Sequence, residues 1–371
     1  MTRASVPRRT LVAMSGGVDS SLAAALLVEA GHDVIGATMK TFCYSGGTTH
    51  ARSCCGLDGI VDARLVADRL GIPHYVFDVE EDFTRDVIDD FVSEYARGHT
   101  PNPCVRCNSY TKFGDLRRRA RELGCDAIAT GHYVRVRHDP GVSRLLRGRD
   151  HAKDQAYFLW GVDPSILPDL EFPVGELTKS EVRERARALG LVTADKPESQ
   201  EICFVPTGDY RDLLEKRLAP RHPALEPGPL VLEDGTVVGE HDGYSAFTVG
   251  QRRGLGGGFG RPMFVLEVRP ETREVVIGPR EALAIDRVRI ETPHWHGAPP
   301  DEGSRVAVQM RHRGDAHACR VTHADPETLL LTLDARCPAV APGQSAVIFD
   351  GDEVLGGGRI AARLRPAPVS V

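Results

Sequence analysis

The sequence lacks any apolar run near its N-terminus that is long enough to cross a membrane. The longest such run is Leu22 to Val28, whereas a spanning helix needs about 20 apolar residues. Residues 1–10 also lack the apolar core of a secretory signal peptide. We therefore expect a cytoplasmic protein with no membrane partner.

Cysteine is too scarce for a disulfide framework, with nine residues in a chain of 371. In a reducing compartment, clustered cysteines are more often catalytic, redox-active or metal-binding than structural. The chain also lacks a second C-x-x-C pair, which weakens a zinc site built from Cys104, Cys107, Cys54 and Cys55. The positions of the cysteines are therefore more informative than their number.

Neither sign of charge is in large excess, since the formal net charge is −6 and charged residues make up 26% of the chain. This composition is typical of globular proteins, and the length predicts two or three domains. The net charge gives no sign of nucleic-acid binding. Between Arg106 and Lys153, however, basic residues outnumber acidic ones. That stretch either faces a phosphate backbone or forms an ordinary solvated surface.

The pattern of apolar runs divides the chain into three parts. From Thr10 to about Ile128, short apolar runs alternate with helical patterns, which is typical of a parallel sheet covered by helices. We predict an α/β domain that closes in a proline-rich stretch after residue 218. Hairpin patterns then predict a small β domain, and later strand patterns predict a β-barrel. The predicted boundaries are 1–218, 219–285 and 286–371.

A glycine-rich segment, AMSGGVDSS from Ala13 to Ser21, follows the first predicted strand and opens the first predicted helix. Ligands bind at this place in a doubly wound sheet. Gly16 and Gly17 allow backbone N–H groups to approach an anion, and the helix N-terminus favours negative charge. Asp19 would repel phosphates unless a cation bridges them, so we expect Mg²⁺. The segment lacks the lysine and the spacing of a Walker A motif.

Three cysteines lie in unusual surroundings: Cys104 and Cys107 follow the segment TPNP, and Cys203 lies within QEICF. The prolines predict a rigid loop before a helix. Cys107, near the start of that helix and beside Arg106, is expected to have thiolate character, which suits a nucleophile. The cysteines in apolar, strand-like settings are expected to be small buried hydrophobic residues: Cys125, Cys319 and Cys337.

Together these motifs, with ATGHY, KDQ and TVGQR, resemble the tRNA-specific 2-thiouridylase family over nearly the whole chain. The resemblance implies a PP-loop ATP pyrophosphatase domain, a small β domain and a C-terminal β-barrel. It implies that ATP adenylates O2 of the wobble uridine of tRNA and that a cysteine persulfide supplies the sulfur. The implied partners are the tRNA anticodon loop and a cysteine desulfurase or sulfur-relay protein.

The resemblance also implies roles for individual residues. Cys107 would be the nucleophile and Cys203 the persulfide carrier, and the two would form a catalytic disulfide. The implied ATP contacts are Ala13, Met14, Ser15, Gly16, Gly17, Val18, Asp19, Ser20, Met39 and Gly131. The implied tRNA contacts are Asn102, Pro103, Cys104, Lys153, Asp154, Gln155, Arg311 and His312.

This chain departs from the better-known members at Cys104, where they carry aspartate. With Cys107 and Cys203 it offers three thiolates, which can hold a [4Fe-4S] cluster with one iron left open to bind sulfide, so this cluster is an alternative to the persulfide. The segment with Cys43, Cys54 and Cys55 also differs, and we assign it no role.

Two further alternatives stay open. One is a PP-loop ligase of the argininosuccinate or NAD synthetase type, which needs no paired cysteines. The other is a nucleotide-gated RNA-binding or redox-sensing protein without turnover. A histidine such as His132 is expected to be a structural hydrogen-bonding group rather than a base.

Overall fold

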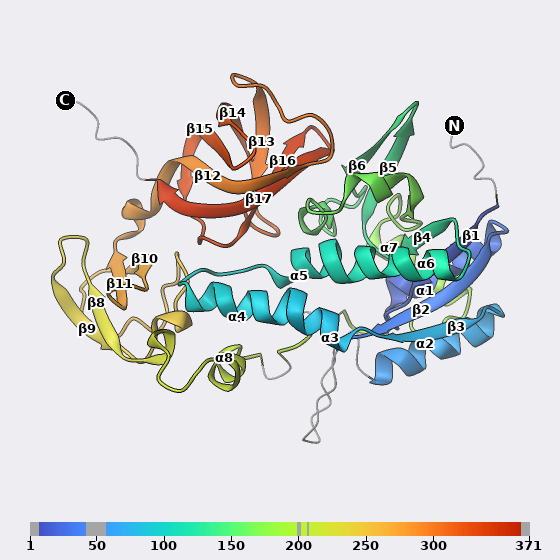
Figure 1. Cartoon of the computed structure of the whole chain (residues 1–371), viewed down its shortest axis with the longest axis horizontal. Helices are drawn as coiled ribbons and strands as arrows, with labels where there is room; N and C mark the ends of the chain where they lie inside the picture. Colours follow the sequence, from blue (N-terminus) through green and yellow to red (C-terminus); the bar gives the residue numbers. More distant parts are fainter. Residues whose placement is uncertain (1–6, 42–56, 199–201, 206–207, 365–371) are drawn as a thin grey trace. The chain divides into compact units, whose positions relative to one another are not determined.

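The computed structural model describes residues 7–41, 57–198, 202–205 and 208–364. Cys43, Cys54 and Cys55 lie outside the described residues. The chain divides into two compact units. Figure 1 labels their helices and strands and colours them by position in the sequence. The first unit consists of Met1–Ile88, Cys104–Gly208 and Asp352–Val354. The second consists of Asp89–Pro103, Asp209–Gly351 and Leu355–Val371.

A parallel sheet in the order β3-β2-β1-β4-β7 forms the centre of the first unit. The strand order reverses between β1 and β4, and ligands bind at such a reversal in doubly wound sheets. The predicted α/β parallel-sheet fold of this part is confirmed. The strands are β1 (Arg9–Ala13), β2 (Asp33–Lys40), β3 (His74–Asp78), β4 (Ala127–Thr130) and β7 (Leu170–Glu171).

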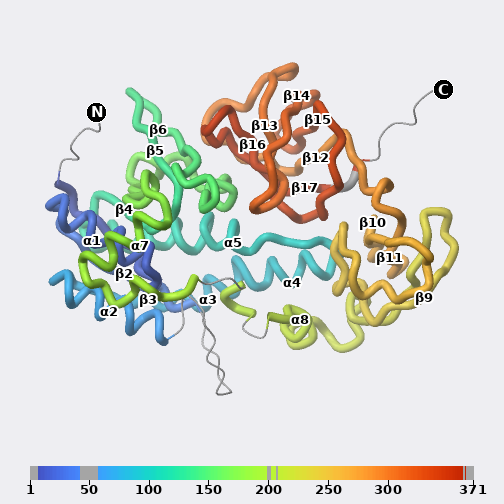
Figure 2. Tube along the Cα trace, turned by 180° about the vertical axis from the view of Figure 1, so that it is seen from behind, coloured from blue at the N-terminus to red at the C-terminus, as the bar shows by residue number. Residues whose placement is uncertain are grey.

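Helices cover both faces of this sheet, which explains why its central strands are almost continuously apolar. Val12, Val34 and Ala129 pack on one face in a core shared with α1, α2 and α7. Figure 2 shows this group of helices from behind. Helix α6 packs against β1 and β4 through buried Leu116 and Ala120. The bounds are α1 (Val18–Glu29), α2 (Leu57–Leu70), α6 (Leu116–Glu122) and α7 (Lys179–Ala188).

The helix that carries two of the predicted cysteines is irregular. It begins as α5 (Pro103–Arg106), continues as the π-helix η2 (Cys107–Asp115) and ends in α6. A second π-helical stretch, η1 (Thr84–Ile88), lies between α3 (Glu80–Phe83) and α4 (Asp89–Ala96). Short π-helical stretches inside helices occur frequently at functional sites.

A hairpin of the first unit, β5 (Val134–Asp139) and β6 (Val142–Arg147), was not predicted from the sequence. Leu146 of β6 pairs with Glu353, which belongs to the same unit. The unit also contains the 3₁₀ helices η3 (Ala156–Phe158) and η4 (Pro164–Asp169).

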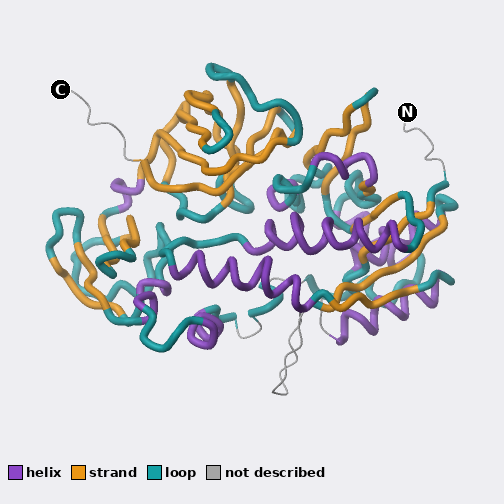
Figure 3. The backbone as a smooth tube through the Cα atoms, viewed as in Figure 1, coloured by secondary structure: helices purple, strands orange, loops and turns teal. Residues whose placement is uncertain are grey.

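The second unit contains a four-stranded sheet in the order β10-β11-β8-β9 and a closed antiparallel barrel (Figure 3). The barrel order is β12-β15-β14-β13-β16-β17, and β17 pairs back onto β12. Ile290, Leu331 and Ile348 lie in its buried core. The predicted small β domain and C-terminal barrel are therefore confirmed as architecture.

The strands of the second unit are β8 (Gly228–Val231), β9 (Val237–His241), β10 (Phe264–Arg269), β11 (Glu274–Gly278), β12 (Ala284–Trp295), β13 (Arg305–Gln309), β14 (Ala316–Ala324), β15 (Thr328–Pro338), β16 (Ser345–Asp350) and β17 (Glu353–Leu364), of which the first two residues of β17 belong to the first unit. Its helices besides α4 are α8 (Arg211–Arg217), η5 (Pro223–Leu225), η6 (Tyr244–Ala246) and η7 (Arg280–Leu283). No helix within the described residues is long and apolar enough to span a bilayer.

Candidate functional site

The glycine-rich segment forms a tight loop between β1 and α1. Gly16 has a φ of +72°, and a Cβ at this position would lie 2.2 Å from the carbonyl oxygen of Gly59 in α2. Only glycine fits there without moving backbone. The Ser20 hydroxyl accepts a hydrogen bond from Ser15 N at 3.1 Å and donates one to Gly17 O at 3.1 Å. These bonds hold the loop in a fixed shape at the start of a helix, which is a favourable place for an anion.

Gly131 brings the end of β4 against this loop. A Cβ at Gly131 would lie 2.5 Å from Ser20 N and 2.6 Å from the carbonyl carbon of Asp19. Met39 is buried near the end of β2. The residues assigned to ATP from the sequence therefore lie together at the carboxyl edge of β1, β2 and β4, where the strand order reverses.

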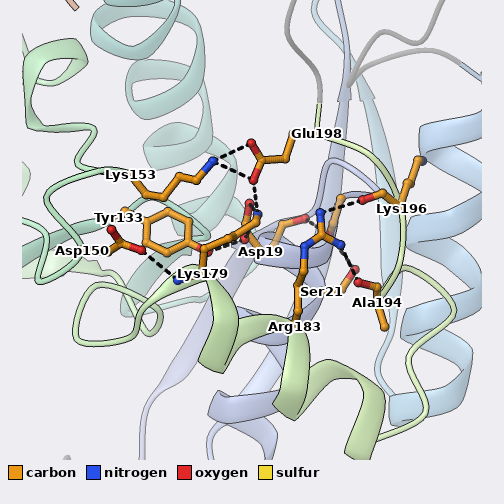
Figure 4. Close-up of polar contacts among 12 residues, drawn as sticks. Asp19, Ser21, Tyr133, Asp150, Lys153, Lys179, Arg183, Ala194, Lys196 and Glu198 are labelled. Atoms are coloured by element: carbon orange, nitrogen blue, oxygen red, sulfur yellow. Dashed lines mark hydrogen bonds and ion pairs between the residues drawn. The ribbon is translucent and has the colours of Figure 1, made fainter. Parts of the chain in front are cut away.

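A lysine lies at the carboxylate of Asp19, where we expected a metal cation. Lys179 Nζ donates to both carboxylate oxygens of Asp19, at 2.7 and 2.8 Å. The Tyr133 hydroxyl donates to the same carboxylate at 2.7 Å (Figure 4). Burial, followed by the charge of Asp19, raises the pKa of Tyr133, so its hydroxyl stays protonated. Asp19 is therefore neutralised by a side chain of the protein itself.

Glu198 joins this cluster by bridging two lysines. Lys153 Nζ donates to its two oxygens at 2.8 and 3.1 Å, and Lys179 Nζ lies 3.1 Å from one of them. The hydrogen bond from Lys153, supported by Lys179, lowers the pKa of Glu198. Nearby, Lys196 Nζ donates to Gly16 O at 3.0 Å and pairs with Asp62.

Sequence reasoning missed Lys179, Glu198 and Lys196. A signal for Lys179 was available, because Thr178 and Glu181 have the spacing of a capping box. The structure forms that box at the start of α7, and Lys179 is the first residue of the helix.

The two predicted catalytic cysteines lie in the first unit, beside neighbours that contact one short segment. Phe204, next to Cys203, packs edge-on against Phe83 with ring centroids 5.8 Å apart. Arg106, next to Cys107, donates to the carbonyl oxygen of Asp86 at 3.3 Å. Both cysteine-bearing segments therefore contact residues 83–86.

One part of the cysteine prediction is wrong. The helix begins at Pro103, as proline favours, so Cys104 lies in its first turn and Cys107 begins the π-helical stretch after it. The argument from a helix N-terminus therefore does not apply to Cys107. Arg106, which we expected to act on this thiol, lies 4.2 Å from the centre of the Tyr110 ring.

The cysteines as placed do not form a metal site. Cys104 is exposed, and Cys107 and Cys203 are partly exposed. In the part of the chain that the structure describes, no three His, Cys, Asp or Glu side chains are arranged to hold a metal ion. These residues therefore do not fit a [4Fe-4S] cluster in this arrangement. Cys125, Cys319 and Cys337 are buried as predicted, and burial raises the pKa of Cys319 to about 12.

Family models match nearly the whole chain. They are a tRNA methyl transferase HUP domain at residues 8–207, a tRNA methyl transferase PRC-barrel domain at 212–279 and an aminomethyltransferase beta-barrel domain at 285–360. The tRNA-specific 2-thiouridylase MnmA of Rhodospirillum centenum is 50% identical over 362 residues, which cover 95% of this chain and 91% of the relative. That of Thermobifida fusca is 47% identical, with 96% of each chain covered. The chain belongs to the tRNA-specific 2-thiouridylase MnmA family.

Solved structures are less similar. An NMN synthetase from Francisella tularensis is 17% identical with a TM-score of 0.34, over 58% of this chain and 79% of that one. A 4-thiouridine synthetase in complex with RNA and ATP is 15% identical with a TM-score of 0.35, over 56% and 50%. Similarity at this level supports no argument about function.

Two of the tRNA contacts inferred from the MnmA resemblance have structural partners. The carboxylate of Asp154 is only 5% exposed and accepts hydrogen bonds from Arg147, Gly148 N and Ala156 N at 2.7 to 3.1 Å. The side-chain oxygen of Gln155 accepts one from Tyr133 N at 2.9 Å. These bonds stabilise the chain around the phosphate loop, and the tRNA contact stays a prediction.

The basic stretch is largely ion-paired. Arg144, for example, pairs with Asp139 and Glu353, and Arg118 pairs with Asp115. Of the two interpretations given for this stretch, the structure favours an ordinary solvated surface for these residues.

The remaining residues that the MnmA resemblance assigns to tRNA are divided between the units: Cys104 and Lys153 lie in the first, and Asn102, Pro103, Arg311 and His312 lie in the second. Asn102 is half-buried, after a loop whose Thr100 hydroxyl lies 3.0 Å from that of Thr248 in the TVGQR motif. Arg311 and His312 are exposed after β13, and Arg311 donates to Ala339 O at 2.7 Å.

Proposed function

We propose that this chain catalyses the ATP-dependent 2-thiolation of the wobble uridine of tRNA. Membership of the MnmA family supports the activity, and the phosphate loop supports the use of ATP. The observation that carries the mechanism is that the segments of Cys107 and Cys203 both contact residues 83–86, in the unit that also contains the loop.

The first step activates the base. ATP binds at Ala13 to Ser20, beside Met39 and Gly131, and O2 of the uridine attacks the α-phosphorus. The bond from this phosphorus to pyrophosphate breaks, so O2 becomes part of a leaving group. Backbone N–H groups of the loop and the hydroxyls of Ser15 and Ser20 stabilise the charge on the phosphates. Mg²⁺ would enter as the ATP complex, and we derive no step from a protein-bound metal.

The second step transfers sulfur. The terminal sulfur of a persulfide on Cys203 attacks C2, the C2–O2 bond breaks and AMP leaves. The Cys107 thiolate then attacks the sulfur of Cys203, which releases 2-thiouridine and forms a disulfide between the two residues. In an alternative order, the Cys107 thiolate first attacks the sulfur of Cys203, which forms the disulfide and breaks the persulfide S–S bond to release hydrosulfide. Hydrosulfide then attacks C2, the C2–O2 bond breaks and AMP leaves. Either route requires a thiol reductant to regenerate both cysteines.

The substrate and partners follow from this chemistry. We propose that Asn102, Pro103 and Cys104 meet the target base and that Arg311 and His312 contact tRNA on the barrel. Unstacking a base from a single-stranded anticodon loop costs little free energy, so the base can be flipped into a pocket. A cysteine desulfurase or sulfur-relay protein would load Cys203, and the cytoplasm is the expected compartment. The division at 1–218, 219–285 and 286–371 is supported by the ranges of the three family models.

Replacement of either cysteine tests the sulfur step. Cys107→Ser and Cys203→Ser should each reduce 2-thiouridine in tRNA to background, because each removes a thiolate that the exchange requires. Mass spectrometry of nucleosides from a strain that carries only the variant gives the measurement. Adenylation, followed as pyrophosphate release with tRNA, should persist in both. Normal thiouridine with either variant would refute the mechanism.

Variants of Cys104 distinguish sulfur transfer by a persulfide from sulfur transfer by an iron–sulfur cluster. Cys104→Ser and Cys104→Asp should keep thiolation when the protein is purified anaerobically and given a persulfide donor. Iron and acid-labile sulfide should be absent from the active protein. Stoichiometric iron that is lost together with activity in the Cys104 variants would instead favour a [4Fe-4S] cluster on Cys104, Cys107 and Cys203.

A further inference from the structure

Two lysines from distant parts of the sequence meet at one carboxylate beside the phosphate loop. Lys153 lies in the segment after β6, and Lys179 is the first residue of α7. Both ammonium groups lie within 3.1 Å of Glu198 oxygens (Figure 4). Lys179 also bonds to Asp19 in the loop. Two positive charges are therefore held next to the place where the phosphates of ATP would bind.

Lys179 is held in position by the protein. Its side chain is only 12% exposed, and its backbone N–H donates to Asp150 at 2.9 Å. The capping box of Thr178 and Glu181 fixes the helix end from which it projects. Because the ammonium group is fixed before a ligand arrives, little side-chain entropy is lost when it binds an anion.

The carboxylate of Glu198 resembles a bound anion in its contacts. It receives hydrogen bonds from both lysines, and these lower its pKa, so it is ionised at neutral pH. Its side chain is 31% exposed, and partly exposed ion pairs of this kind are weak and exchange readily. Asp19, in contrast, keeps a second donor in Tyr133 if Lys179 turns to another anion.

We propose that Lys153 and Lys179 bind the pyrophosphate portion of ATP and that the carboxylate of Glu198 occupies this position until the phosphates displace it. The inference rests on the proposed adenylation at the loop. Negative charge develops on the departing pyrophosphate as its bond to the α-phosphorus breaks, and two fixed ammonium groups stabilise that charge. Lys153 then serves the nucleotide rather than the tRNA.

Direct binding of inorganic pyrophosphate to the full chain without tRNA tests this proposal, at fixed Mg²⁺ and by calorimetry. Glu198→Gln should bind pyrophosphate about threefold more tightly, because the competing charge is removed while the side-chain size is kept. Lys179→Met should bind it about tenfold more weakly or worse, and Lys153→Met should also weaken it. In Glu198→Gln/Lys179→Met the gain should vanish. The same order is expected with α,β-methylene-ATP.

Two exposed residues provide matched controls: Glu184→Gln on α7 and Lys216→Met on α8 should leave the pyrophosphate affinity unchanged. Unchanged or weaker binding by Glu198→Gln would overturn the role of Glu198. Normal pyrophosphate binding with weakened tRNA binding in Lys153→Met would overturn the role of Lys153. Thiouridine formation by the unmodified chain is measured separately, so failure of this inference can be told apart from failure of the proposed function.

Discussion

His132 shows at the scale of one residue how burial fixes a protonation state. It follows Gly131 at the end of β4, and its Nδ1 lies 2.6 Å from the Thr130 hydroxyl. Burial, with a smaller contribution from the charge of Lys112, lowers its pKa to about 3. The ring is therefore neutral throughout the range in which the enzyme would work. This agrees with a structural hydrogen-bonding role, because a ring with so low a pKa is a poor general base at neutral pH.

The lowered pKa of His132 predicts a pH dependence of stability. The unfolded state binds a proton near pH 6.5 that the folded state refuses until about pH 3. Above pH 6.5 the ring is neutral in both states and does not oppose folding. Between pH 6.5 and about pH 3 only the unfolded state binds the proton, so the free energy of unfolding falls by about 1.4 kcal/mol for each pH unit. In His132→Asn this contribution to the slope should disappear. The difference in free energy of unfolding between the variant and the unmodified chain, measured in urea, should therefore shrink from pH 7 to pH 4. An equally steep slope in His132→Asn would contradict the prediction; the exposed His151→Gln should keep the full slope.

The sequence could reveal some of the residues around the phosphate loop but not their partners. Gly16 and Gly131 belong to recognisable motifs because their missing side chains are required locally. Lys179 is separated from Asp19 by 160 positions, and a single lysine at the start of a helix looks like any other surface lysine. The expected cation was therefore assigned to Mg²⁺, although the fold supplies an ammonium group there.

At the scale of one element, the start of α7 sets the position of Lys179. The Thr178 hydroxyl accepts a hydrogen bond from Glu181 N at 3.3 Å, and the Glu181 carboxylate accepts one from Thr178 N at 2.6 Å. Thr178→Ala should lower the free energy of unfolding by about 1 kcal/mol, as loss of an N-cap does. It should also weaken ATP binding, because Lys179 projects from the frayed end. Denaturant unfolding and nucleotide titration provide the two measurements.

The conservative variant Thr178→Ser keeps the cap and should restore both stability and ATP affinity. If Thr178→Ala lowered stability but bound ATP normally, the helix start would not position Lys179 for the nucleotide.

Sequence reasoning missed the elements whose residues show neither the apolar alternation of a strand nor the apolar spacing of a regular helix. In β5 and β6, arginines interrupt the apolar pattern of mostly half-buried strands, so the sequence of this segment indicates a basic stretch rather than a sheet. The turn signal Asp139-Pro140-Gly141 was present but lacked apolar strands on either side. Pro103 begins the helix instead of ending the loop before it, so Cys107 lies further from the helix start than the prolines predicted. The π-helical stretch from Cys107 to Asp115 has no sequence signature of its own.

At the scale of the whole molecule, the second unit joins segments that are far apart in the sequence. Asp89–Pro103 belongs to the same unit as the β regions: the Tyr244 hydroxyl donates to Ala96 O across 148 positions, and Gln344 donates to Thr100 O across 244. Arg359, for example, pairs with Asp90 and Glu94. The alternation of apolar and polar residues along the sequence predicts the barrel strands. It cannot show that the loop before Cys104 forms hydrogen bonds with a residue of another predicted domain.

Gln344 holds the loop at Thr100 and Pro101 in place within the second unit. Its side-chain amide donates to Thr100 O at 2.7 Å and to Pro101 O at 3.4 Å, immediately before Asn102. Gln344→Ala should raise the KM for tRNA about tenfold, since it leaves a half-buried carbonyl without its donor and loosens the residues proposed to meet the base. Pyrophosphate binding at the phosphate loop should not change. Gln344→Glu keeps the size but loses the donor, so it should share the defect, whereas the exposed Glu271→Ala should not. An unchanged KM for tRNA in both Gln344 variants would show that the loop does not position the target base.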